Sequence, residues 1–158
     1  METASLSEIK KELKLLPPEQ ILEHCLRLVK FKKENKELLS YLLFEAANEQ
    51  MFVRQAKEDV DLQFKNLNKN SLYLAKKTLR KVLRTINKYI KFSKHKTTEL
   101  ELLIYFCIKL RKSGLPLNRS KVLKNMYQLR LDRIHKVLAM LHEDLQYDYQ
   151  DEVETLIN

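Results

Sequence analysis

Residues that form turns are scarce in this chain. Its 158 residues include one glycine, Gly114, three prolines (Pro17, Pro18 and Pro116) and no tryptophan. Tight hairpins between short strands depend on glycine and similar residues, so this scarcity argues against a fold of many short strands. Leucine, lysine and glutamate are abundant instead, and these side chains lose little rotamer freedom in a helix. The composition therefore predicts an all-α protein.

Cysteine and long apolar runs are also scarce. Cys25 and Cys107 lie among apolar residues and lack the spacing of a metal or redox motif, so we expect both to be reduced core residues. The longest apolar run, residues 102–108, is far shorter than the ~20 residues of a membrane-spanning helix. Residues 1–16 are too charged for a signal peptide. These absences predict a cytoplasmic protein with no membrane partner.

Motifs for catalysis and for metal or cofactor binding are absent. There is no HExxH, no glycine-rich phosphate loop and no nucleophile placed beside a base. His135 and His142 would lie about 10 Å apart along a helix, too far to share a metal ion unaided, and His24 and His95 are isolated. We therefore expect no cofactor, no metal and no enzymatic activity, although catalytic residues that converge from distant positions leave no motif.

The spacing of apolar residues predicts seven or eight helices. Ser5 and Glu8 form a capping box for the first helix, which must stop before Pro17, and Pro18 suits the start of the second. The buried stripe of this second helix is expected at residues 21, 22, 25, 26 and 29. Whether residues 38–67 form one kinked helix or two helices separated at Asn48 stays open.

The second half of the chain has its own boundary signals. Residues 71–93 are expected to form one helix, and Thr98 with Glu101 predicts a second capping box opening the next, which ends at Gly114. Residues 118–145 are expected to form two helices that meet at residues 128–131, with Asp132 capping the second. Residues 146–158 are acidic and are expected to fray.

Short connections between these helices predict antiparallel neighbours within a single domain, residues 1–158. Two architectures remain open, an irregular multi-helix bundle and a short right-handed array of αα-hairpins. The second is HEAT-like only at the level of pattern, because the chain has no fixed repeat period.

One segment carries a resemblance to known sequences. Residues 16–64 contain Leu16-Pro17-Pro18, then HCLRL at residues 24–28 and FKKENKELLSYLLFEA at residues 31–46. In these runs the chain resembles a family of small uncharacterised bacterial all-helical proteins. That family has no assigned activity, so the resemblance implies a helical fold and no functional residues.

Acidic residues are missing from one stretch of the chain. Between Ser71 and Lys96 there are nine basic residues and no acid. The rest of the chain contains 21 basic and 21 acidic residues, so this stretch accounts for the whole net charge of +9. On a helical wheel the apolar residues of this stretch gather on one side and the basic residues on the other. The basic side consists of Lys77, Arg80, Lys81, Arg84, Lys88 and Lys91.

Like charges three and four residues apart repel each other by a few tenths of a kcal/mol. Three arrangements would offset this repulsion. Solvent and salt would screen it, since the Debye length is ~8 Å. Acidic residues 143–154 of this chain or of a second copy would neutralise it, or an external polyanion would bind. Tyr73, Tyr89 and Phe92 are expected to pack rather than to stack on bases.

The sequence therefore predicts a non-enzymatic binding module whose basic face engages an acidic partner. In its most specific form, the prediction is that this partner is the backbone of nucleic acid. The alternative is a structural or protein–protein interaction module, for example a homodimer, in which acidic side chains neutralise that face. A second basic region is expected to be an ordinary helical hairpin, because it lacks the turn glycine and the short polar residues of a helix-turn-helix reader. Its residues are Arg119, Lys121, Lys124, Arg130, Arg133 and Lys136.

Overall fold

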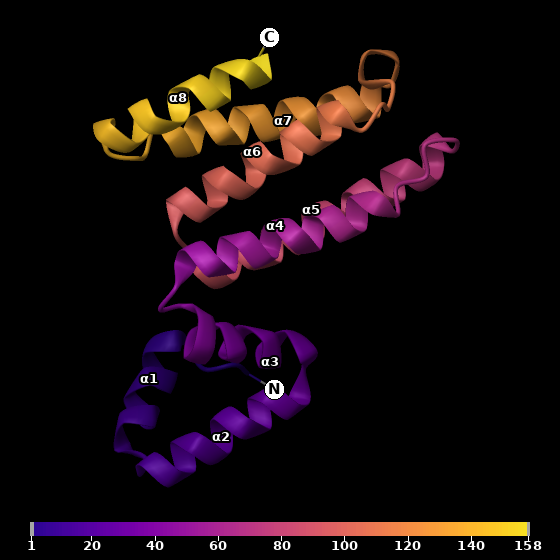
Figure 1. Ribbon diagram of the computed structural model, residues 1–158. Coiled ribbons are helices and arrows are strands. Elements are labelled where there is room, and N and C mark those ends of the chain that lie inside the picture. Colours follow the sequence, from indigo (N-terminus) through magenta and orange to yellow (C-terminus); the bar gives the residue numbers. More distant parts are fainter. Residues whose placement is uncertain (1, 158) are drawn as a thin grey trace. The chain divides into compact units, whose positions relative to one another are not determined.

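The computed structural model describes residues 2–157, which form eight α-helices, one π-helical turn and one 3-10 turn and include no strand (Figure 1). The helices are α1 (Leu6–Leu15), α2 (Pro18–Phe31), α3 (Lys33–Ser40), α4 (Glu49–Lys65), α5 (Leu72–Ser93), α6 (Lys96–Lys112), α7 (Lys121–Leu138) and α8 (Glu143–Ile157). The π-helical turn Tyr41–Glu45 follows α3, and the 3-10 turn Leu117–Arg119 precedes α7. The predicted all-α, multi-helix fold is confirmed. Within residues 2–157, every helix is too short or too polar to cross a membrane.

Polar side chains cap several of the helix starts. Ser5 and Glu8 form the predicted capping box of α1, in which each side chain bonds to the backbone N–H of the other residue. The Asn48 side chain accepts a hydrogen bond from the backbone of α4, so α3 and α4 are separate helices. Ser71 and Ser120 cap α5 and α7 in the same way. These polar residues end the apolar pattern of one helix and open the next.

The predicted capping box at the start of α6 is wrong. Lys94 adopts a left-handed conformation, with φ of 60°, which ends α5 abruptly and makes His95 the N-cap of α6. The helix therefore begins three residues earlier than expected. Thr98 donates its hydroxyl hydrogen bond to Glu49 of α4 over 2.5 Å instead, and Glu101 binds Lys57 of α4. Tertiary contacts between helices use the side chains that the local pattern assigned to a cap.

The predicted break at residues 128–131 is also wrong, because α7 is one continuous helix. Its buried residues continue through that stretch at helical spacing, and no glycine or proline interrupts them. Asp132 lies in mid-helix, where its carboxylate accepts a 2.9 Å hydrogen bond from Gln128 one turn earlier. The described residues 118–145 therefore do not form the two short helices of a helix-turn-helix reader.

Contacts divide the chain into two compact units, residues 1–44 and 45–158. The second unit contains a continuous hydrophobic core, and α6 is its central helix. Figure 1 shows α6 between the α4–α5 pair and the α7–α8 pair, and α6 packs against all four helices. Accordingly most of α6 is buried, with Leu100, Phe106 and Cys107 inaccessible to solvent. The expectation for Cys107 as a core residue is confirmed.

The first unit has no comparable core. Its α2 packs against α3, and the side-chain amide of Asn35 bonds to the carbonyl of Leu28 over 2.9 Å. Only Ile21, Cys25 and Val29 of the predicted α2 stripe are half-buried, and Leu22 and Leu26 are exposed, because one partner helix covers only part of the circumference. Cys25 is therefore not the core residue that we expected.

Residues 146–157 belong to α8. Val153 and Leu156 are buried as α8 packs against α6 and α7. The hydroxyl group of Tyr127 donates a 2.7 Å hydrogen bond to the carbonyl of Leu156, near the end of the helix. The acidic segment is thus an ordered helix over the described residues, and it has a defined position within the second unit.

Candidate polyanion interface

Helix α5 is amphipathic, and its apolar side fixes its orientation. Ala75, Leu79, Val82 and Ile86 are fully buried against the neighbouring helices. Their spacing of three and four residues places them on one side of the helix. Burial of this side turns the opposite side toward solvent.

The exposed side of α5 carries the predicted basic residues. We call this set the basic strip, and it consists of Lys77, Arg80, Lys81, Arg84, Lys88 and Lys91. All are exposed except Lys88, which is half-buried with its ammonium group 5.4 Å from the ring centroid of Tyr89. The structure therefore gives the strip the orientation that the helical wheel predicts.

The exposed members of the basic strip lack acidic partners in the part of the chain that the structure describes. Among residues 2–157, no ion pair involves Lys77, Arg80, Lys81, Arg84 or Lys91. Neighbours along the helix repel each other, as Lys77 and Lys81 or Arg80 and Arg84 do at a spacing of four residues. These five exposed side chains are a local concentration of positive charge.

Two basic residues at the α4–α6 contact are paired. Lys57 of α4 binds Glu101 of α6 over 2.8 Å, and Lys109 of α6 binds Asp61 of α4 over 2.8 Å. Partial burial opposes ionisation of Asp61, but hydrogen bonds from Lys109 and Tyr105 keep the pKa of this carboxyl group below its usual value. Pairing of this kind is absent from the exposed members of the basic strip.

The acidic residues of α8 do not cover the basic strip. All six are exposed, none forms an ion pair or hydrogen bond with α5 among the described residues, and α8 packs against α6 and α7. Intramolecular neutralisation of the strip by residues 143–154 is therefore not observed. The six are Glu143, Asp144, Asp148, Asp151, Glu152 and Glu154.

The second basic region is more dispersed. Arg119 lies in the 3-10 turn, and the other five residues lie along α7 at positions that spread over more than half of its circumference. Arg133 is not available as a separate cation, because its Nε lies 2.6 Å from a carboxylate oxygen of Glu99. This hydrogen bond raises the pKa of Arg133. The structure does not gather these residues into a single strip.

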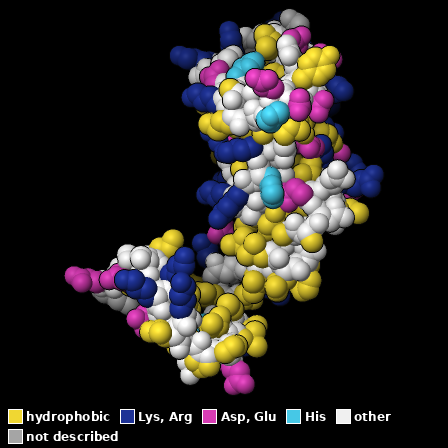
Figure 2. Space-filling view, turned by 90° about the vertical axis from the view of Figure 1, so that its left-hand side faces the viewer, with side chains coloured by type: hydrophobic (Ala, Val, Ile, Leu, Met, Phe, Trp, Pro, Cys, Tyr) yellow, Lys and Arg dark blue, Asp and Glu magenta, His cyan; other side chains and the backbone are white. Residues whose placement is uncertain are grey.

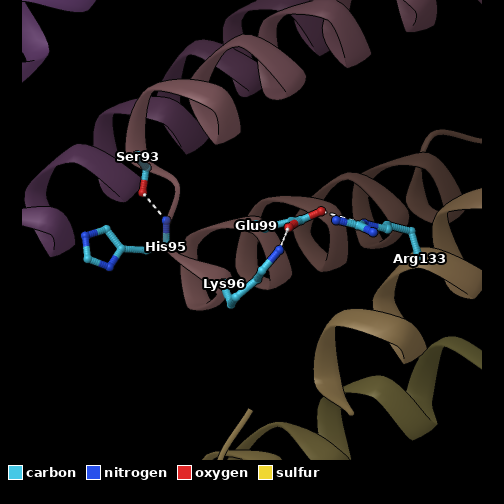
Figure 3. Close-up of polar contacts among 5 residues, drawn as sticks. All are labelled: Ser93, His95, Lys96, Glu99 and Arg133. Carbon is cyan, nitrogen blue, oxygen red and sulfur yellow. Dashed lines mark hydrogen bonds and ion pairs between the residues drawn. The ribbon is translucent and has the colours of Figure 1, made fainter. Parts of the chain in front are cut away.

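A polar cluster at the junction of α5 and α6 holds the helices together (Figure 3). Glu99 is buried, and it pairs with Arg133 of α7 and with Lys96 over 3.3 Å. Ser93 accepts a hydrogen bond from the backbone N–H of His95, and Figure 3 shows the His95 ring turned away from both Ser93 and Glu99. Because the imidazole reaches neither side chain, His95 is not placed as a base for Ser93, and the ion pair of Glu99 with Arg133 ties α6 to α7.

The sequence did not predict the contacts that Glu99 and Glu49 make with neighbouring helices. The sequence did contain a signal for Glu99. It lies in a largely apolar helix, and a buried acid in such a helix needs a partner from a neighbouring helix. Glu49 accepts hydrogen bonds from the hydroxyl groups of Ser93 and Thr98, which joins the start of α4 to the α5–α6 junction. These two carboxylates position the end of α5.

The remaining candidate residues form no site. No group of three or more histidine, cysteine, aspartate and glutamate residues in the described part of the chain is arranged to hold a metal ion. The thiols of Cys25 and Cys107 are free. No family model, curated protein or solved structure matches this chain.

Proposed function

We propose that this protein is a non-enzymatic binding module whose basic strip engages the backbone of a polyanion, with nucleic acid as the partner. The observation that supports the proposal is the row of exposed cations on α5 without acidic partners. A solvated surface normally mixes charges of both signs. Phosphates would relieve the repulsion along the strip and release their own counterions.

The geometry of α5 suits contact with several phosphates. Its 22 residues extend over about 33 Å at 1.5 Å per residue. Arginine and lysine on one side of a straight helix contact backbone oxygens and carry no arrangement for reading base edges, so binding would be independent of sequence. If four or five phosphates are neutralised, log K falls with log[salt] with a slope of about −4 on duplex DNA.

Fluorescence anisotropy with a mixed-sequence DNA duplex between 50 and 200 mM salt tests this proposal. The key variant combines Arg80→Glu, Lys81→Glu and Arg84→Glu, which leaves Lys88 and its contact with Tyr89 in place. We expect binding to be lost while the helical circular dichroism is retained.

The matched control combines Lys121→Glu, Lys124→Glu and Lys136→Glu on α7. It changes the net charge by the same amount at exposed positions outside the strip. We expect it to retain most of the affinity. Absence of wild-type binding at 50 mM salt, or equal loss in both triple variants, would contradict the proposal.

A second candidate function is neutralisation of the strip by another protein, including a second copy of this chain. The exposed acids of α8 favour it, because residues 143–157 contain six acids and no base. Such an association would disappear at high salt and in a variant with Asp148→Asn, Asp151→Asn and Glu152→Gln. Unchanged association in that variant would exclude α8 as the partner surface.

The proposed location is the cytoplasm. Both cysteines are free thiols, and free thiols suit a reducing compartment. Nucleic acid is accessible there, so the location is compatible with the proposed partner.

A further inference from the structure

The first unit presents an excess of apolar side chains at its surface. Among residues 2–44 only Tyr41 is buried, and Leu6, Phe31 and Phe44 are more than three-quarters exposed. Hydrophobic side chains reach the surface of this unit in the lower part of Figure 2. Exposed apolar surface on this scale marks an interaction site rather than a solvated face.

Helix α2 shows where the missing cover belongs. Its Ile21, Cys25 and Val29 point toward α3 and are half-buried. A separate row runs along the uncovered flank, where Leu22 is 60% and Leu26 48% exposed. We call this row the α2 seam, and it consists of Glu19, Leu22, Leu26 and Lys30, spaced by three, four and four residues. That spacing keeps all four side chains on one line along the helix, as in a coiled-coil seam.

The order of charges along the α2 seam selects the occupant. The acid lies at the N-terminal end, the base at the C-terminal end, and the leucines lie between them. Neither Glu19 nor Lys30 forms an ion pair in the described part of the chain. A second α2 running antiparallel would set Leu22 against Leu26 and Glu19 against Lys30, twice each. A parallel copy would instead set like charges against each other.

We propose that the first unit is a homodimerisation element in which the α2 seams of two copies pack antiparallel. The two α2–α3 pairs then form a four-helix bundle about a two-fold axis that passes near residue 24 of both chains. The leucines lose their contact with water, and the two Glu19–Lys30 pairs close the ends of the seam. This dimer requires no nucleic acid and does not depend on the proposed function of α5.

A dimer would have a consequence for the second unit. Each assembly would carry two basic strips, and binding of the second strip to the same polyanion would be intramolecular. The affinity for a long duplex would then exceed the affinity for one that accommodates a single strip. Dimerisation and polyanion binding remain separately measurable, because the α2 seam shares no residue with α5.

Sedimentation velocity without nucleic acid, from micromolar to several hundred micromolar protein, tests the dimer. We expect the wild-type chain to shift from monomer to dimer over this range. The variant Leu22→Glu with Leu26→Glu should be monomeric throughout, with unchanged helical circular dichroism because both side chains are exposed. The control Leu62→Glu, at an exposed leucine of α4, should dimerise like the wild type.

Charge reversal tests the antiparallel arrangement. Glu19→Lys alone and Lys30→Glu alone each set like charges against each other at both ends of the seam, and we expect about a tenfold weaker dimer for each. The double variant Glu19→Lys with Lys30→Glu restores opposite charges and should recover the wild-type dimer constant. A structural effect of either substitution would not be reversed by the other.

Several outcomes would overturn the inference. A wild-type chain that stays monomeric at the highest concentration excludes the dimer. A dimer that survives Leu22→Glu with Leu26→Glu uses another surface. Failure of the double charge reversal to restore the dimer excludes the antiparallel pairing.

Discussion

The two units of this chain have similar helical patterns but treat their apolar side chains differently. In the second unit the apolar sides of α4, α5, α7 and α8 meet on α6 and are buried. In the first unit α2 and α3 are amphipathic as well, yet Leu22, Leu26 and Phe31 remain exposed. The comparison shows that apolar periodicity identifies the side of a helix that needs cover, but does not identify the chain segment or partner that provides it.

The largest expected difference between the units concerns two phenylalanines. Phe106 in α6 is 0% exposed, and Phe31 at the end of α2 is 84% exposed. We expect Phe106→Ala to lower the free energy of unfolding by about 3–5 kcal/mol, because it leaves a cavity in the core. Phe31→Ala should change it by less than about 0.5 kcal/mol in the monomer. Urea unfolding followed by circular dichroism measures both changes in unfolding free energy. Equal changes for the two variants would contradict the difference that we describe between the units.

The two cysteines provide a chemical test of the same contrast. Burial raises the pKa of the Cys107 thiol to about 12, whereas Cys25 is only half-buried. Since the thiolate is the reactive form, we expect Cys25 to react with a disulfide reagent at pH 8 at least about 100-fold faster than Cys107. Single-cysteine variants report each rate, and both should react rapidly in denaturant. Comparable rates in the native protein would mean that the core around α6 opens readily.

A smaller effect is expected where the second unit pairs its charges. Arg133→Ala removes the 2.6 Å partner of the buried Glu99 and leaves this carboxylate with Lys96 alone. We expect a loss of about 1–3 kcal/mol in the free energy of unfolding, the usual cost of an under-satisfied buried polar group. Lys136→Ala on the same helix, at an exposed position, should cost less than about 0.5 kcal/mol. A neutral Arg133→Ala would show that the pair does not hold α6 to α7.

The smallest expected effect concerns the exposed charges of α5. Arg84→Glu replaces two repulsive contacts, with Arg80 four residues earlier and Lys81 three residues earlier, by two attractive ones. We expect the free energy of unfolding to rise by about 0.5–1 kcal/mol at low salt and by less at high salt. Thermal unfolding at two salt concentrations measures the change. A loss of stability would mean that Arg84 has a structural partner.

Local signals predicted most of the fold. The capping box at Ser5, the helix start at Pro18 and the helix boundary at Ser71 each depend on side chains close in sequence, and the structure contains all three. The sequence left open whether a break occurs at Asn48, and the structure has a cap there. The failures occur where tertiary contacts redirect a side chain. Thr98 and Glu101 bind α4 instead of capping α6, and this depends on residues some 45 positions away.

The candidate site was predictable to a similar extent. The wheel of α5 gave the orientation of the basic strip, because one buried side determines the opposite one. The sequence could not predict that α8 leaves the basic strip uncovered, since this depends on where residues 143–157 pack. Nor was the exposure of Leu22 and Leu26, because no local pattern indicates that α2 has a single neighbouring helix.

The central place of α6 has a consequence for synthesis of the chain on the ribosome. When residues 96–112 emerge, α4 and α5 are already available to cover one side of the apolar helix, but α7 and α8 are not. At 5–20 residues per second, the next 45 residues take roughly 2–9 s to appear. During that interval the opposite side of α6 is bare, and chaperones or aggregation partners compete for it. Codon changes that slow translation after residue 112 should therefore lower the yield of folded protein. Codon changes that slow translation before residue 96 should lower it less.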